Sequence, residues 1–115
     1  MKTNANKLAI IWSSSDKEVA ERVILMYAQG AKAQKWFEEI TILVWGPATN
    51  TLAHEAHLKN TVKEMLKTGI SIKACSACSE SYGVTKEIEA IGIEVIPLGP
   101  LLTDYIKNDV KILTF

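Results

Sequence analysis

Short, mainly apolar runs, each ended by a turn signal, recur along the chain at 7–12, 41–45, 70–74, 93–96 and 111–115. Runs of this kind predict strands that are buried in a sheet. Segments with helical spacing or helix caps separate them. Because strands alternate with helices, we expect an α/β fold, a three-layer α/β/α sandwich with a mainly parallel five-stranded sheet.

The helix signals between these runs are caps and glycine stops. Ser15 and Glu18 have the spacing of a capping box, so the first helix is expected to begin near Asp16. The predicted helices are 16–36, a helix that begins at Asn50 or Thr51 and ends at Gly69, a short helix from Cys75 to Gly83, 86–91 with Thr85 as its cap and Gly92 as its end, and 101–108.

The length of 115 residues predicts a single domain, 1–115. Thirteen basic and thirteen acidic residues give zero formal net charge. A nucleic-acid-binding face needs excess positive charge, so we expect no nucleic-acid partner. The glycine motifs of dinucleotide and nucleoside-triphosphate sites are absent from the sequence, and we expect no cofactor.

The only two cysteines are Cys75 and Cys78. Two are too few for a disulfide scaffold, and a chain of this length builds a core without one. The apolar run at 8–12 is too short for a signal peptide or a membrane span. We therefore expect a cytoplasmic protein whose thiols are reduced.

In a parallel sheet, ligands bind beyond the carboxyl ends of the strands. Both cysteines follow the third strand directly, so this edge is the expected site. Trp12 and Trp45 end their strands here and are candidates for its walls. The other candidate pocket residues, from the turns and from the start of the second helix, are Ser13, Gly46, Pro47, His54 and Gly99.

The Cys-x-x-Cys spacing is compatible with three chemistries. The pair can cycle between dithiol and disulfide, or form half of a zinc site that His54 and His57 complete. In the third, a thiolate accepts sulfane sulfur as a persulfide and passes it on, which requires neither metal nor nucleotide. We expect no bound metal. A non-catalytic oligomeric module that binds a small ligand is the alternative from another class.

The segment 72–85 resembles the DsrE/DsrF-like family of small sulfur-relay proteins, which includes the TusD type. The shared features are an apolar strand, a cysteine, a short helix, and a glycine followed by a second helix, carried here by Cys75, Gly83 and Val84. The rest of the chain agrees with the family in outline. Cys78 corresponds to a second cysteine found in some DsrE-like proteins and not in the TusD type.

The resemblance implies that Cys75 accepts sulfur as a persulfide and that Cys78 is a relay or resolving thiol. It implies sulfur-donor and sulfur-acceptor proteins or small thiols as partners. It also implies a homo-oligomer, with a trimer or hexamer favoured. Apolar residues that exceed the obvious needs of the strands agree with an oligomer, namely Trp36, Phe37, Leu98, Leu101 and Leu102.

Overall fold

A computed structural model describes residues 4–115, so residues 1–3 of the predicted domain lie outside the described part. Five strands form one sheet in the order β4-β3-β2-β1-β5, and every neighbouring pair is parallel. The strands are β1 (Asn4–Trp12), β2 (Glu39–Val44), β3 (Ser71–Cys75), β4 (Glu94–Ile96) and β5 (Val110–Thr114). The predicted fold class is confirmed.

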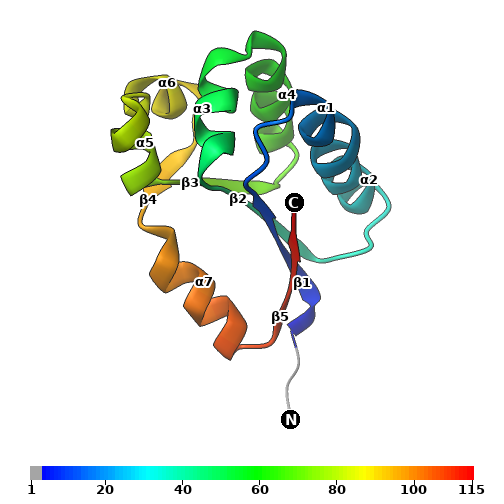
Figure 1. The fold of residues 1–115 in the computed structure, drawn as a ribbon. Coiled ribbons are helices and arrows are strands. Elements are labelled where there is room, and N and C mark those ends of the chain that lie inside the picture. Colours follow the sequence, from blue (N-terminus) through cyan, green and yellow to red (C-terminus); the bar gives the residue numbers. More distant parts are fainter. Residues whose placement is uncertain (1–3) are drawn as a thin grey trace.

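The strand order explains the layers. From β1 to β4 each step moves one strand in the same direction, so right-handed crossovers place all intervening helices on one face. The return from β4 to β5 runs the opposite way past three strands, so the same rule places its helix on the other face. Figure 1 shows this arrangement, with α7 (Leu98–Lys107) alone beneath the sheet.

The first helix is continuous but changes its winding. It comprises α1 (Lys17–Val19), the π-helical segment η1 (Ala20–Leu25) and α2 (Met26–Ala33). The predicted cap at Ser15 is wrong by one residue, because the Asp16 carboxylate accepts the N–H groups of Glu18 and Val19 at 2.8 and 3.1 Å. The helix also ends before the predicted Trp36.

The second predicted helix begins earlier than expected and is broken in two. Its parts are α3 (Pro47–His54) and α4 (Ala56–Lys67), with extended backbone at Glu55 between them. Gly46 precedes α3 without a capping side chain, and Pro47 takes the first helical position, where its missing N–H costs no helical hydrogen bond.

The remaining helices are α5 (Ser76–Tyr82) and α6 (Thr85–Ile91). Left-handed glycines end both, as predicted for Gly83 and Gly92. α7 begins at Leu98 rather than at the predicted Leu101. Pro100 is tolerated there because the first turn of a helix has no intrahelical N–H bonds to lose.

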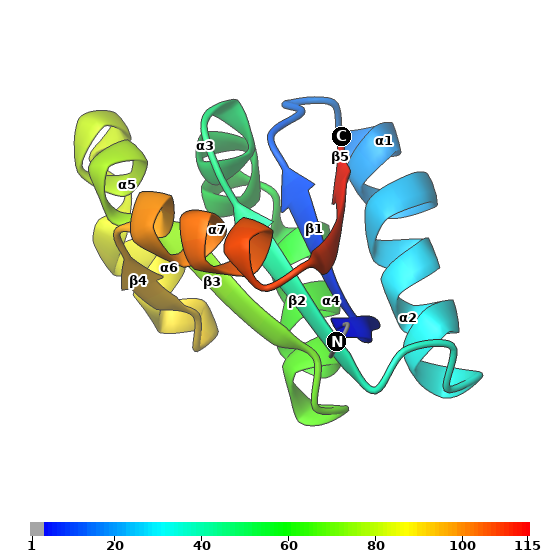
Figure 2. The ribbon, with the colours of Figure 1, turned by 90° about the horizontal axis from the view of Figure 1, so that it is seen from below.

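The two faces of the sheet have very different cores. The face covered by α1 to α6 carries the main core, with Ile10 and Trp12 of β1 and Ile42 of β2 fully buried in it. The opposite face carries a second, smaller hydrophobic cluster, whose buried residues are Leu43, Cys75 and Leu98. Figure 2, seen from that side, shows α7 crossing the sheet on its way to β5.

Candidate functional site

The two thiols lie at a point where the connections of neighbouring strands part. β3 and β4 pair side by side, with Cys75 opposite Ile96. The chain leaves β3 toward α5 on the main-core face and leaves β4 toward α7 on the other face (Figure 1). Such a divergence at the carboxyl edge of a parallel sheet is where ligands bind in α/β proteins.

Backbone N–H groups hold both sulfur atoms. Cys75 is the N-cap of α5, and its Sγ accepts the N–H of Cys78 at 3.4 Å. The Cys78 Sγ accepts the N–H of Gly46 at 3.3 Å, which joins the ends of β2 and β3. The Ser79 hydroxyl donates to the Cys75 carbonyl at 2.8 Å and fixes the first turn of α5.

The thiols are free, and they differ in exposure. Cys75 is buried, with 5% of its surface exposed, whereas Cys78 is partly exposed. Burial, and then the hydrogen bond with the Cys75 thiol, raise the pKa of Cys78 above its ordinary value. The Gly46 N–H acts in the opposite direction, because it favours the thiolate.

An apolar shell surrounds the two sulfurs. Leu43 and Leu98 are its buried members beside Cys75, and we call this whole group the thiol cluster. Its partly buried members are Ile11, Trp45, Cys78, Ile96, Leu101 and Tyr105. On the same face of β3, Lys73 pairs with Glu94 at 3.3 Å. The shell limits access of water to Cys75.

The other predicted pocket residues lie near this edge in different roles. The Ser13 hydroxyl donates to the Phe115 carbonyl oxygen at 2.9 Å, and the Ser13 carbonyl oxygen accepts the Ala48 N–H at 3.2 Å, so Ser13 ties the chain end to α3. Pro47 is exposed at the start of α3. Gly99 is exposed in the first turn of α7, next to Leu98 of the thiol cluster.

The histidines do not join the thiols. Because the helix breaks at Glu55, His54 is the last residue of α3, at the end remote from Gly46, and its Nδ1 lies 2.9 Å from the Asn50 carbonyl oxygen. His57 pairs with Glu21 at 2.9 Å. No group of three or more metal-ligating side chains occurs among residues 4–115, so the Cys₂His₂ zinc site is not formed there.

Of the two tryptophans expected at the pocket, only Trp45 belongs to the thiol cluster. Trp12 points to the main core and donates from Nε1 to the Ser14 carbonyl at 3.2 Å. Ile11, Leu43 and Tyr105 also belong to the thiol cluster and were not among the predicted pocket residues. Side-chain alternation along β1 and β2 carried a signal for the first two, since residues 11, 43, 45 and 75 share one face once register is known.

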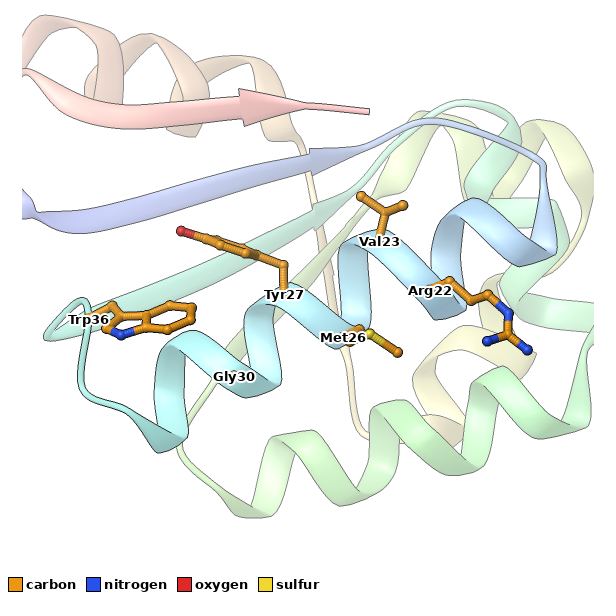
Figure 3. Close-up of a pocket in the computed structure, with 6 residues that line it drawn as sticks. All are labelled: Arg22, Val23, Met26, Tyr27, Gly30 and Trp36. Carbon is orange, nitrogen blue, oxygen red and sulfur yellow. The ribbon is translucent and has the colours of Figure 1, made fainter.

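A separate groove of about 480 Å³ follows the first helix (Figure 3). Its lining consists of Arg22, Val23, Met26, Tyr27, Gly30 and Trp36. The Tyr27 and Trp36 rings lie 5.8 Å apart at 37°. Of the five apolar residues that were expected to exceed the needs of the strands, Trp36 is 56% exposed. Leu98 is buried in the thiol cluster, and Phe37, Leu101 and Leu102 are partly buried.

In the described part of the chain, no helix combines the length and apolar character needed to cross a membrane.

Solved structures share this fold over nearly the whole chain. A conserved protein of unknown function from Bacteroides thetaiotaomicron, BT1422, is 36% identical, with a TM-score of 0.92 and coverage of 96% of this chain and 95% of that one. The YchN protein of E. coli is 16% identical (TM-score 0.72; coverage 96% and 99%). A protein of unknown function from Methanobacterium thermoautotrophicum, MTH1491, is 15% identical (TM-score 0.73; coverage 94% and 97%).

No curated protein matches the sequence. The model of the DsrE/DsrF-like family matches residues 6–115. Together with the five-stranded parallel sheet and the cysteine that ends β3, this match decides the relationship that the segment 72–85 suggested. The chain belongs to the DsrE/DsrF-like family.

Proposed function

We propose that this protein is a sulfur carrier that holds sulfane sulfur as a persulfide on Cys75, with Cys78 as a relay or resolving thiol. Membership of the DsrE-like family supports a role in sulfur relay in general. The single observation that carries the specific proposal is the hydrogen bond between the side chains of two free cysteines at the carboxyl edge of the sheet, one sheltered and one partly exposed.

The surroundings of Cys75 suit the storage of a labile sulfur. The thiol cluster is apolar and limits contact with water and small reductants, which remove sulfane sulfur. The Cys78 N–H donates to the Cys75 Sγ at 3.4 Å, so a backbone contact fixes the sulfur that would carry the persulfide.

The chemistry requires only thiol exchange. A thiolate attacks the outer sulfur of a donor persulfide, a sulfur–sulfur bond forms on the protein, and the donor leaves as a thiolate. In the resolving route, the Cys78 thiolate attacks the Cys75 sulfur of the persulfide. A Cys75–Cys78 disulfide forms and hydrosulfide leaves, so the sulfane sulfur is reduced while the two cysteines are oxidised.

The proposed partners are a sulfur donor and a sulfur acceptor, either proteins or small thiols, in the cytoplasm. We also propose a homo-oligomer, and the exposed apolar residues around Trp36 support it. A simple thiol–disulfide couple is the second candidate, because the hydrogen-bonded dithiol geometry is compatible with it.

Mass spectrometry tests the proposal. After incubation with a persulfide donor and trapping, we expect a gain of one sulfur atom that peptide mapping assigns to Cys75. The Cys75→Ser variant should lose the stable adduct. An adduct of the same amount and lifetime in that variant would contradict the role of Cys75. A disulfide formed without any sulfur-bearing species would favour the second candidate.

A further inference from the structure

The order in which the two thiols meet a sulfur donor follows from their burial. Cys75 exposes 5% of its surface and packs in one cluster with Leu98 of α7, whereas Cys78, one helical turn further, is partly exposed. A donor therefore meets the Cys78 sulfur before the Cys75 sulfur, which is the less exposed of the two.

A segment distant in the sequence also positions the Cys78 thiol. The Gly46 N–H that donates to its Sγ comes from a residue 32 positions earlier, at the end of β2. Gly46 has φ +58° and ψ −138°, a conformation that is open to glycine and strained for other residues. No heavy atom lies within 4 Å of the Cβ position, so this backbone conformation, rather than crowding, requires glycine.

We infer that Cys78 is the thiol that receives sulfur from the donor, that it passes this sulfur inward to Cys75, and that Gly46 is the positioning residue for the first step. This inference rests on the proposed function and adds a direction to it. The Gly46 N–H holds the Cys78 sulfur at the mouth of the site and stabilises the negative charge of its thiolate.

Each step balances as a thiol exchange. The Cys78 thiolate attacks the outer sulfur of the donor persulfide, which forms a persulfide on Cys78 and releases the donor thiolate. The Cys75 thiolate then attacks the outer sulfur of that persulfide. A sulfur–sulfur bond forms at Cys75, the bond at Cys78 breaks, and Cys78 recovers the thiolate that the Gly46 N–H accommodates. No external oxidant or reductant is consumed.

The first test measures loading with a short-chain persulfide donor, with site-resolved mass spectrometry over time. The Cys75→Ser variant should gain sulfur on Cys78 at least as fast initially as the wild type and then lose it quickly to added thiol. The Cys78→Ser variant should load Cys75 about tenfold more slowly or worse, because its thiol is buried. Loading of Cys75 at the wild-type rate without Cys78 would overturn the inference.

The second test addresses Gly46. Gly46→Ala forces the backbone out of its glycine conformation, so the rate of Cys78 alkylation by iodoacetamide should fall on the order of tenfold, the size of one lost hydrogen bond to a charged group. The pH midpoint of alkylation should also rise. Gly92→Ala is the matched control, because Gly92 also has a positive φ of 104° and only an ordinary contact at its Cβ position, and it lies at the end of α6, outside the thiol cluster. Equal alkylation rates in both variants would remove the role of Gly46.

The pH midpoint of Cys78 alkylation distinguishes a loss of the Gly46 hydrogen bond from a general loss of folded structure. Cys75 is the ionisable side chain that acts on Cys78. Lys73 of β3 and Glu94 of β4 are paired with each other. Should the wild type gain no sulfur at all, the proposed function fails. The alkylation order of the two thiols still decides the structural claim, since faster alkylation of Cys75 than of Cys78 would refute it.

Discussion

The two faces of the sheet differ in thickness and in chemistry. The face beneath α1 to α6 buries an extensive core of apolar side chains, whereas the face beneath α7 buries a small cluster that contains the sheltered thiol. Ile42 and Leu43 are neighbours on β2, yet the first belongs to the main core and the second to the thiol cluster. The main core on one face therefore supplies most of the buried apolar contacts, and the proposed site lies on the other face.

The largest expected effect is a loss of free energy of unfolding when the main core is truncated. Ile42→Ala leaves a cavity in the main core, and we expect the free energy of unfolding to fall by about 4 kcal/mol, near the upper end for such truncations. Urea denaturation measures it. In conditions where the variant is folded, alkylation of Cys75 should be unchanged. A large increase would show that the two faces are not independent.

Leu98→Ala makes the corresponding truncation in the thiol cluster, on the opposite face of the sheet. Leu98 has partly exposed neighbours in the thiol cluster, so we expect a smaller loss of about 2 kcal/mol. The alkylation rate of Cys75 should rise several-fold, because the side chain that covers it is gone. Ile106→Ala, on the same helix at a residue 58% exposed, is the control and should change neither quantity. If Leu98→Ala left the alkylation rate of Cys75 unchanged, Leu98 would not be what shelters this thiol.

The pH dependence tests the electrostatics of the outer thiol. Burial, followed by the contact with Cys75, raises the pKa of Cys78, so less of it is thiolate at neutral pH than for a free cysteine. The alkylation rate of Cys78 should therefore rise with pH, with a midpoint above that of free cysteine. Cys75→Ala removes one cause of the shift and should lower the midpoint. A midpoint below that of free cysteine would contradict this account.

The smallest effect on stability is expected at the groove. Trp36→Ser removes an exposed ring and its contact with Tyr27, at a cost of no more than about 1.5 kcal/mol. If this surface joins subunits, light scattering should show a smaller assembly for the variant than for the wild type. Lys35→Ser, at the neighbouring exposed position, is the control. An unchanged mass for Trp36→Ser would exclude this surface from the oligomer.

Much of the fold was predictable because strand burial leaves a strong trace in sequence. The runs at 7–12 and 41–45 correspond to central strands whose faces are both covered. The edge that holds Cys75 was predictable for a topological reason, since parallel strands bring their carboxyl ends together. The order of the strands in the sheet could not be predicted, because register and crossover direction depend on contacts between distant segments.

The errors have local causes. The start of α3 was missed because Gly46 caps it through backbone conformation and carries no capping side chain. Because the helix was predicted to begin at Asn50 or Thr51, His54 was placed near its start and beside the thiols, whereas His54 is the last residue of α3. The break at Glu55 has no side-chain cap either. Trp12 and Trp45 were grouped together because both end strands. In fact they point to opposite faces, a distinction that requires the register of the sheet.

The central claim is that Cys75 stores sulfane sulfur within the thin face of the sheet. Peptide mapping of the protein after exposure to a persulfide donor and a brief thiol wash tests it most directly. The account predicts one extra sulfur atom on Cys75, and none after the same wash in Cys75→Ser. A wash-resistant sulfur on Cys78 alone, or the same adduct in Cys75→Ser, would contradict it.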